Sequence, residues 1–116
     1  MEELQGRVTV APPVLTTIVR QATLEERGVN RLAPLPAKVR GLRAGVAMEE
    51  GILVGVTDQG AHIEVHVVAE PDAHALRLGA AVQNAVTRAV EEMVGMTVIA
   101  VDVHIDDVAR PAARPE

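Results

Sequence analysis

The sequence contains no cysteine and no phenylalanine, tryptophan or tyrosine. Without cysteine the chain cannot form disulfides, thiolate metal sites or a thiol nucleophile, and a reducing cytoplasm is its expected compartment. Without aromatic rings it has no platform on which nucleic-acid bases stack, no aromatic cage for a quaternary ammonium group and no aromatic belt at a membrane interface. Both absences narrow the classes of function open to this protein.

The chain also lacks a long hydrophobic run and an excess of positive charge. Its longest charge-free apolar stretch near the C-terminus, residues 93–101, falls far short of the roughly 20 residues that a membrane-spanning helix needs. The N-terminus is acidic rather than basic, unlike an export signal. A formal net charge of -5 and a pI of about 5.3 argue against general electrostatic binding of nucleic acid. We therefore expect a cytoplasmic protein that neither binds nucleic acid nor enters a membrane directly.

Serine is absent as well, so threonine supplies every aliphatic hydroxyl group in the chain. None of the threonines stands in a glycine-flanked nucleophile turn, and a hydroxyl nucleophile without a positioned base is weak. Two pairs of carboxylates are adjacent in sequence, Glu91 with Glu92 and Asp106 with Asp107. Sequence neighbours point to different sides of a helix or strand, so neither pair forms an acid–base dyad. The sequence therefore predicts no enzymatic activity and no cofactor.

Length and composition fit one small domain. The chain has 116 residues, of which 48% are hydrophobic, and this is enough for one core but not for two. Small aliphatic side chains must fill that core, and the 20 valines favour a β-sheet. We expect a single α+β domain over residues 1–108 and a disordered tail, rich in proline and arginine, over residues 109–116.

Hydrophobic spacing predicts a helix between Asp72, its expected N-cap, and Gly95, which suits a helix C-terminus because glycine readily adopts a positive φ. Apolar residues recur at three- and four-residue steps on one side of this helix. They are Leu78, Val82, Ala85, Val86, Ala89, Val90 and Met93. Beyond Gly95 the period becomes two, which predicts a strand with one apolar face. That face comprises Ile99, Val101, Val103 and Ile105.

The first half of the chain predicts a strand, a helix and a hairpin. Residues 6–10 alternate as a short strand, and a helix then runs from Pro13 to its closing residue Gly28. Prolines and glycine make residues 30–43 a predicted loop. A β-hairpin follows, with Gly60 in its turn. Its strands are residues 52–57 and 61–69.

These elements follow in the order βαββαβ and predict an α+β fold. Two amphipathic helices and roughly four strands, each with one apolar face, are satisfied when both helices pack on one face of the sheet. The result is a two-layer α/β sandwich whose other face is exposed. With ferredoxin-like connections the hairpin strands lie side by side, and the third and fourth strands are not neighbours.

Histidine and carboxylate side chains share a face on each of the last two predicted strands. The first group is His62, Glu64 and His66, and the second is Asp102, His104 and Asp106. One strand cannot complete a metal site, because His62 and His66 lie about 13 Å apart along it. A full set of ligands needs both strands side by side, which the ferredoxin-like order does not provide. We therefore predict a solvated face that binds no metal, and we place His74 on the surface.

The segment from Asn30 to Met48 is the best candidate binding site, because it carries four basic residues and no acidic one in a chain that is otherwise acidic. The four are Arg31, Lys38, Arg40 and Arg43. One interpretation is an anionic partner, such as a phosphorylated ligand, an anionic lipid surface or an acidic protein face. The alternative is intramolecular pairing with glutamates nearby in the sequence. These are Glu25, Glu26, Glu49 and Glu50.

Several short segments are informative through their order along residues 6–108. They are Gly6-x-Val8-x-Val10, Gly28-Val29, Ile63-Glu64-Val65-His66-Val67, Val82-Gln83-Asn84-Ala85-Val86, Met93-Val94-Gly95 and Val101-Asp102-Val103. In this order they resemble the bacterial alkaline shock protein family.

The resemblance implies a bacterial cytoplasmic protein without enzymatic activity, which self-associates as a homo-oligomer and serves the cell envelope as a scaffold. It also implies that the chain binds a protein partner during envelope stress. Where that partner is anchored in the membrane, it would hold the chain at the membrane periphery. The second implication is a link to lipid (fatty-acid) synthesis. Together with the basic residues between Asn30 and Met48, this link suggests an alternative function, a small regulatory module that binds an enzyme of lipid synthesis or an anionic metabolite.

Overall fold

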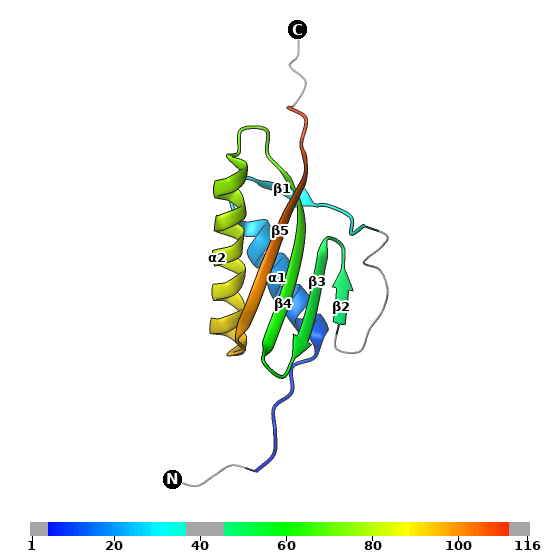
Figure 1. Cartoon of the computed structure of the whole chain (residues 1–116), viewed down its shortest axis with the longest axis vertical. Coiled ribbons are helices and arrows are strands. Elements are labelled where there is room, and N and C mark those ends of the chain that lie inside the picture. The colour runs from blue at the N-terminus through cyan, green and yellow to red at the C-terminus, as the bar shows by residue number, and fades with distance from the viewer. Residues whose placement is uncertain (1–4, 37–45, 112–116) are drawn as a thin grey trace.

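The computed structural model of the chain describes residues 5–36 and 46–111. Its elements are α1 (Pro12–Glu25), β1 (Val29–Leu32), β2 (Val46–Glu49), β3 (Ile52–Thr57), β4 (Gly60–Ala69), α2 (Ala75–Val94) and β5 (Val98–Val108). Both helices lie on one face of a five-stranded sheet, and no helix of the described ranges covers the opposite face (Figure 1). We call this opposite face the open face. The layering confirms the predicted α+β sandwich.

Strand β4 is the centre of the sheet. β5 pairs with β4 in parallel along one side. β3 and β1 share the other side, both antiparallel to β4, and β2 pairs with the outer side of β3. Because parallel neighbours need a crossover, α2 joins β4 to β5 on the helical face. The predicted hairpin is confirmed as β3 and β4.

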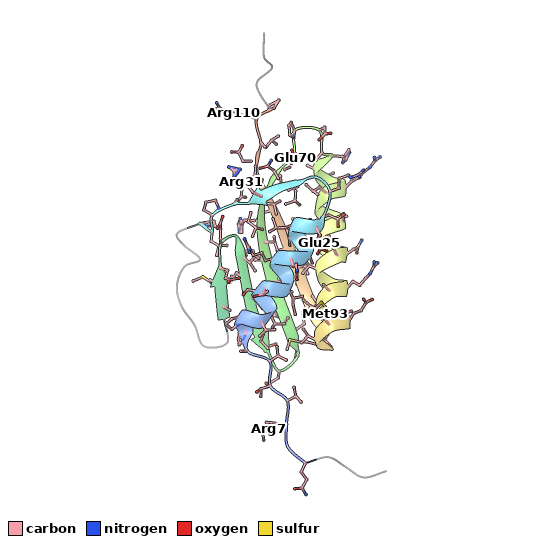
Figure 2. The ribbon with its side chains drawn as sticks, turned by 180° about the vertical axis from the view of Figure 1, so that it is seen from behind. Arg7, Glu25, Arg31, Glu70, Met93 and Arg110 are labelled. Carbon is pink, nitrogen blue, oxygen red and sulfur yellow. The ribbon has the colours of Figure 1, made fainter. Side chains whose placement is uncertain are left out.

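Aliphatic side chains fill nearly all of the core between helices and sheet. Val82, Val86 and Val90 of α2 are fully buried at four-residue spacing, which confirms the predicted helix face. The other large hydrophobic side chains that are fully buried are Leu15, Val19, Ile52, Val54, Val65 and Val67. Met93 was predicted on the buried side but is 69% exposed, at the far end of α2 (Figure 2).

The N-terminal part of the sheet differs from the prediction. Residues 6–10 form no strand, and Val8 is 92% exposed. Alternation in sequence is typical of a strand, but a strand also needs a partner for its backbone groups, and this segment has none among the described residues. In contrast, β1 and β2 form within or beside the predicted loop. Each has only four residues, too few for a period of two to stand out.

The predicted ends of the helices are correct in part. Gly95 closes α2 with φ +77°, and its N–H donates to the carbonyl of Glu91 at 3.0 Å, as predicted for a helix C-terminus. The N-cap of α2 is His74 instead of Asp72, because His74 Nδ1 accepts a hydrogen bond from the Arg77 N–H. The C-cap of α1 is the extended residue Glu26, so Gly28 turns the chain into β1 and does not close the helix itself.

A register shift moves one side chain of β5 out of the predicted core. Ala61 pairs with Val98, but the next residue of β4, His62, pairs with Ala100. Ile99 is therefore the extra residue of a β-bulge and is 41% exposed, while Val98 packs against the core. The prediction that Ile99 points inward is wrong for this reason. Beyond the bulge, Val101 is buried on the helical face as predicted.

Candidate functional site

The polar faces of β4 and β5 lie side by side on the open face. Glu64 pairs in register with Asp102, and His66 with His104. The expectation that these two strands are not neighbours is therefore wrong. In the ferredoxin-like order the first strand would separate them, but residues 6–10 do not join the sheet, and β5 takes the place next to β4.

Four side chains make up what we call the His66 cluster: Glu64 and His66 from β4, and His104 and Asp106 from β5. The Nδ1 atom of His66 lies 2.7 Å from Asp106 Oδ2, and its Nε2 atom lies 2.7 Å from Glu64 Oε2. The imidazole ring of His104 stacks on that of His66, with ring centroids 4.4 Å apart and planes inclined by 8°. His66 is 4% exposed, so the prediction of a solvated face does not hold for this residue.

The backbone holds His66 at a junction of three strands. Its N–H donates to the carbonyl of Gly51, just before β3, and its carbonyl accepts from the N–H of Ala33, just after β1, both at 2.8 Å. β3 and β1 therefore meet end to end along β4 at this residue. A Cβ atom added to Gly51 would lie 2.8 Å from the Ala33 carbonyl oxygen, so the junction is tightly packed. His66 has a fixed position as a result.

The two carboxylates favour the positively charged form of His66. Both ring nitrogens lie at hydrogen-bond distance from carboxylate oxygens, and both can donate only if the ring is an imidazolium. Burial of the ring lowers the pKa of His66, but the hydrogen bonds to Glu64 and Asp106 and their negative charges outweigh burial and raise it above its usual 6.5. Within residues 5–36 and 46–111 no other ion pair has an N–O distance of 4.0 Å or less.

This arrangement is unsuited to hydrolytic chemistry by a side-chain nucleophile. A histidine base needs one ring nitrogen free for the nucleophile, whereas both nitrogens of His66 contact carboxylates. In the described part of the chain, four threonine hydroxyl groups donate hydrogen bonds to backbone carbonyl oxygens. They are Thr16, Thr17, Thr23 and Thr57. The geometry favours a structural or cation-holding role for the cluster over acid–base catalysis.

A hollow of about 140 Å³ lies on the open face beside Glu64. Gly55 of β3 is the register partner of His62 and adds no side chain there, so the space above the strands is left free. The lining residues are Val46, Leu53, Gly55, His62, Ile63, Glu64 and Asp102. The hollow therefore gives small molecules and ions access to one side of the His66 cluster.

Of the four basic residues predicted to bind a partner, the structure describes one. Arg31 is exposed on β1, where it pairs with Val68 of β4. Figure 2 shows it at the end of the molecule that also carries Glu70 and Arg110. The other three lie outside the described residues: Lys38, Arg40 and Arg43.

A wider cleft, of about 600 Å³, opens near the start of α2 and was not predicted. Its charged and polar lining combines Arg27 and Arg77 with Glu70, Asp72 and His74. These residues come from two segments far apart in sequence, so no local sequence motif indicates the cleft. His66 was missed for a similar reason, because its burial depends on which strand lies beside β4.

The family model for the alkaline shock proteins, described as having a cell envelope-related function, matches residues 1–110. The chain belongs to the alkaline shock protein family. This confirms the resemblance read from the order of the short segments. No curated protein and no solved structure matches the chain. In the described ranges no helix is both long enough and apolar enough to span a membrane.

Proposed function

We propose that this protein is a non-enzymatic scaffold of the bacterial cell envelope, which self-associates and binds a protein partner from the cytoplasmic side, including a partner anchored in the membrane. The observation that supports this most is a sheet face that no described helix covers, in a chain whose family has a cell envelope-related function. That family is not known for enzymatic activity. Both ring nitrogens of His66 contact carboxylates, so His66 itself is not free to act as a base for a nucleophile, in agreement with the proposal.

The outer edge of β5 is the surface through which we propose that copies associate. β5 has 11 residues and pairs only with β4 among the described strands. Two of its backbone groups bond side chains of α2, since the Val98 N–H donates to Glu91 and the Val101 carbonyl accepts from Gln83. Beyond Val101 no described strand pairs with this side of β5. Such an edge readily accepts another strand. Ile99 adds an exposed aliphatic side chain at the bulge on this strand.

Light scattering after size exclusion tests self-association with a matched pair of variants. Ile99→Lys places a charge on β5, and Leu76→Lys places the same charge on α2, where Leu76 is 84% exposed. We expect an oligomer for the unmodified chain, a lower mass for Ile99→Lys and no change for Leu76→Lys. A monomer at high protein concentration would overturn self-association, and equal masses for both variants would move the interface away from β5.

Affinity capture tests the partner. The full chain serves as bait against cytosolic and membrane fractions of the source bacterium, with the retained proteins identified by mass spectrometry. We expect a partner with a membrane-spanning segment to be enriched from the membrane fraction. If only enzymes of lipid synthesis are retained, the alternative function below is favoured.

The alternative is a small regulatory module linked to fatty-acid synthesis or to an anionic metabolite. Arg31 and the cleft lined by Arg27 and Arg77 favour it, since these guanidinium groups lie near the same end of the fold. Glu70 and Asp72 oppose it, because they line the same cleft with negative charge. Titration with inorganic phosphate and with an acyl thioester of coenzyme A, followed by calorimetry, separates this module from a scaffold, which should bind neither.

A further inference from the structure

The His66 cluster brings together ligand types that transition metals prefer. Glu64, His66 and His104 each offer one donor atom, and these three atoms lie within 4.8 Å of one another. Imidazole nitrogen and carboxylate oxygen are ordinary ligands of Zn²⁺. We propose that Glu64, His66 and His104 form a binding site for a divalent transition metal ion, with Zn²⁺ the best match.

The position of Glu64 beside His66 supports two of the three ligands. Glu64 Oε2 and His66 Nε2 are 2.7 Å apart, a hydrogen-bond distance. Two ligands of a tetrahedral zinc ion, each about 2.0–2.1 Å from the metal, lie about 3.3 Å from each other. A side-chain displacement of about 0.6 Å therefore converts the hydrogen bond into an edge of a coordination tetrahedron, with the Nε2 proton released to solvent.

The other ring nitrogen of His66 already has the partner that a ligating histidine usually needs. Metal-bound histidines donate their second N–H to a carboxylate or carbonyl, which fixes the ring and strengthens the ligand. Asp106 Oδ2 lies 2.7 Å from His66 Nδ1 and fits this role. The backbone bonds from His66 to Gly51 and Ala33 hold the residue itself in place. His66 is thus oriented before an ion arrives.

His104 completes the site by turning. Its ring is stacked parallel to that of His66, so the in-plane lone pairs of the two rings do not meet at one point as they stand. His104 is exposed, so its side chain can move to another staggered rotamer once it leaves the stacked position on His66. The hollow beside Glu64 leaves room for a water molecule as the fourth ligand. Asp102 lines this hollow and is the nearest alternative carboxylate.

Calorimetric titration of the full chain with ZnCl₂, after treatment with a chelator and at neutral pH, tests the site. We expect one ion per chain and at least a tenfold loss of affinity for Glu64→Gln and for His104→Ala. Asp106→Asn should weaken binding about 10–100-fold, the range seen when the carboxylate behind a ligating histidine is lost. Titration with Co²⁺ should give the visible absorption bands of a four-coordinate ion with nitrogen and oxygen ligands.

His74→Ala is the matched control, because His74 is an exposed histidine at the N-cap of α2, outside the cluster. It should leave the affinity for Zn²⁺ unchanged. Glu64 and His104 are not buried, so their variants should fold, and circular dichroism checks this. The proposal is overturned if Zn²⁺ does not bind at micromolar concentration, or if the double variant Glu64→Gln, His104→Ala binds it as tightly as the unmodified chain.

Discussion

Without a metal ion, the protein should become less stable as the pH rises from about 6.5 to 9, and His66 should be the cause. Its pKa in the folded state is raised above the usual 6.5 by hydrogen bonds to Glu64 and Asp106, against the opposing effect of burial. Between the unfolded and folded pKa values, the folded state binds more protons than the unfolded state. The free energy of unfolding then falls with increasing pH. The contribution is complete below pH 6.5 and is lost as the pH passes the folded pKa.

The size of this effect follows from the partners of His66. Each unit by which folding raises a pKa corresponds to about 1.4 kcal/mol, and a buried hydrogen bond to a charged group contributes about 1.5–3 kcal/mol. The side chains of Glu64 and Asp106 are 25% and 39% exposed, so water screens both carboxylates. We therefore expect a total loss of about 1–2 kcal/mol, or a melting temperature lower by about 4–8 °C for a domain of this size. His104 and Asp102 are the other titratable groups nearby, and both are exposed.

Urea unfolding followed by circular dichroism between pH 6 and 9, with a chelator present, measures this loss. Fluorescence cannot replace it, because the chain has no tryptophan or tyrosine. His66→Gln keeps a polar side chain that does not titrate, so its stability should change much less over the same pH range. A stability that is constant or rises from pH 6.5 to 9 in the unmodified chain would refute the reasoning. An equal loss in His66→Gln would place the titrating group elsewhere.

Three further substitutions, two of them paired with a control substitution, test the geometry. Asp106→Asn should lower the free energy of unfolding at pH 6 by about 1–2 kcal/mol, while Asp107→Asn should change it by less than about 0.5 kcal/mol, because Asp107 is an exposed neighbour outside the His66 cluster. Gly51→Ala should cost more than about 2 kcal/mol through its positive φ and its close backbone contact, whereas Gly79→Ala, with nothing within 4 Å, should stabilise α2 by about 1 kcal/mol. Thermal melts compare each pair directly. Arg31→Glu should leave the melting temperature within about 2 °C but weaken any binding of inorganic phosphate in calorimetry; unchanged phosphate binding would exclude Arg31.

Local periodicity explains which parts of the fold could be predicted. Val82, Val86 and Val90 face the core because a helix repeats every 3.6 residues, and Gly95 ends α2 because it is free to adopt a positive φ. Both signals are contained within a few consecutive residues. The layering of two helices on one sheet face follows from their apolar sides and needs no knowledge of strand order.

The parts that could not be predicted depend on contacts between distant segments. β1 is a strand because Val29 to Leu32 reach the end of β4, about 40 residues later, and not because of its own four residues. Ile99 is exposed because β5 slips by one residue against β4, and a slip of this kind leaves no local trace in the sequence. Of the predicted basic site, only Arg31 lies in the described ranges, so its role remains a prediction.

The His66 cluster depends on both local periodicity and contacts between distant segments. The sequence pattern identified its residues but not their environment. The pattern of His62, Glu64 and His66 in one strand correctly indicates a shared face. Whether that face is solvated depends on the neighbour of β4, which is β5 only because residues 6–10 stay outside the sheet. Once β5 lies there, His66 receives a carboxylate at each ring nitrogen and a second ring above it. A cation, whether a proton on the ring or the metal ion we propose, then neutralises charge that the chain has gathered from both strands, and this ties the end of β5 to the junction of β1 and β3 through His66.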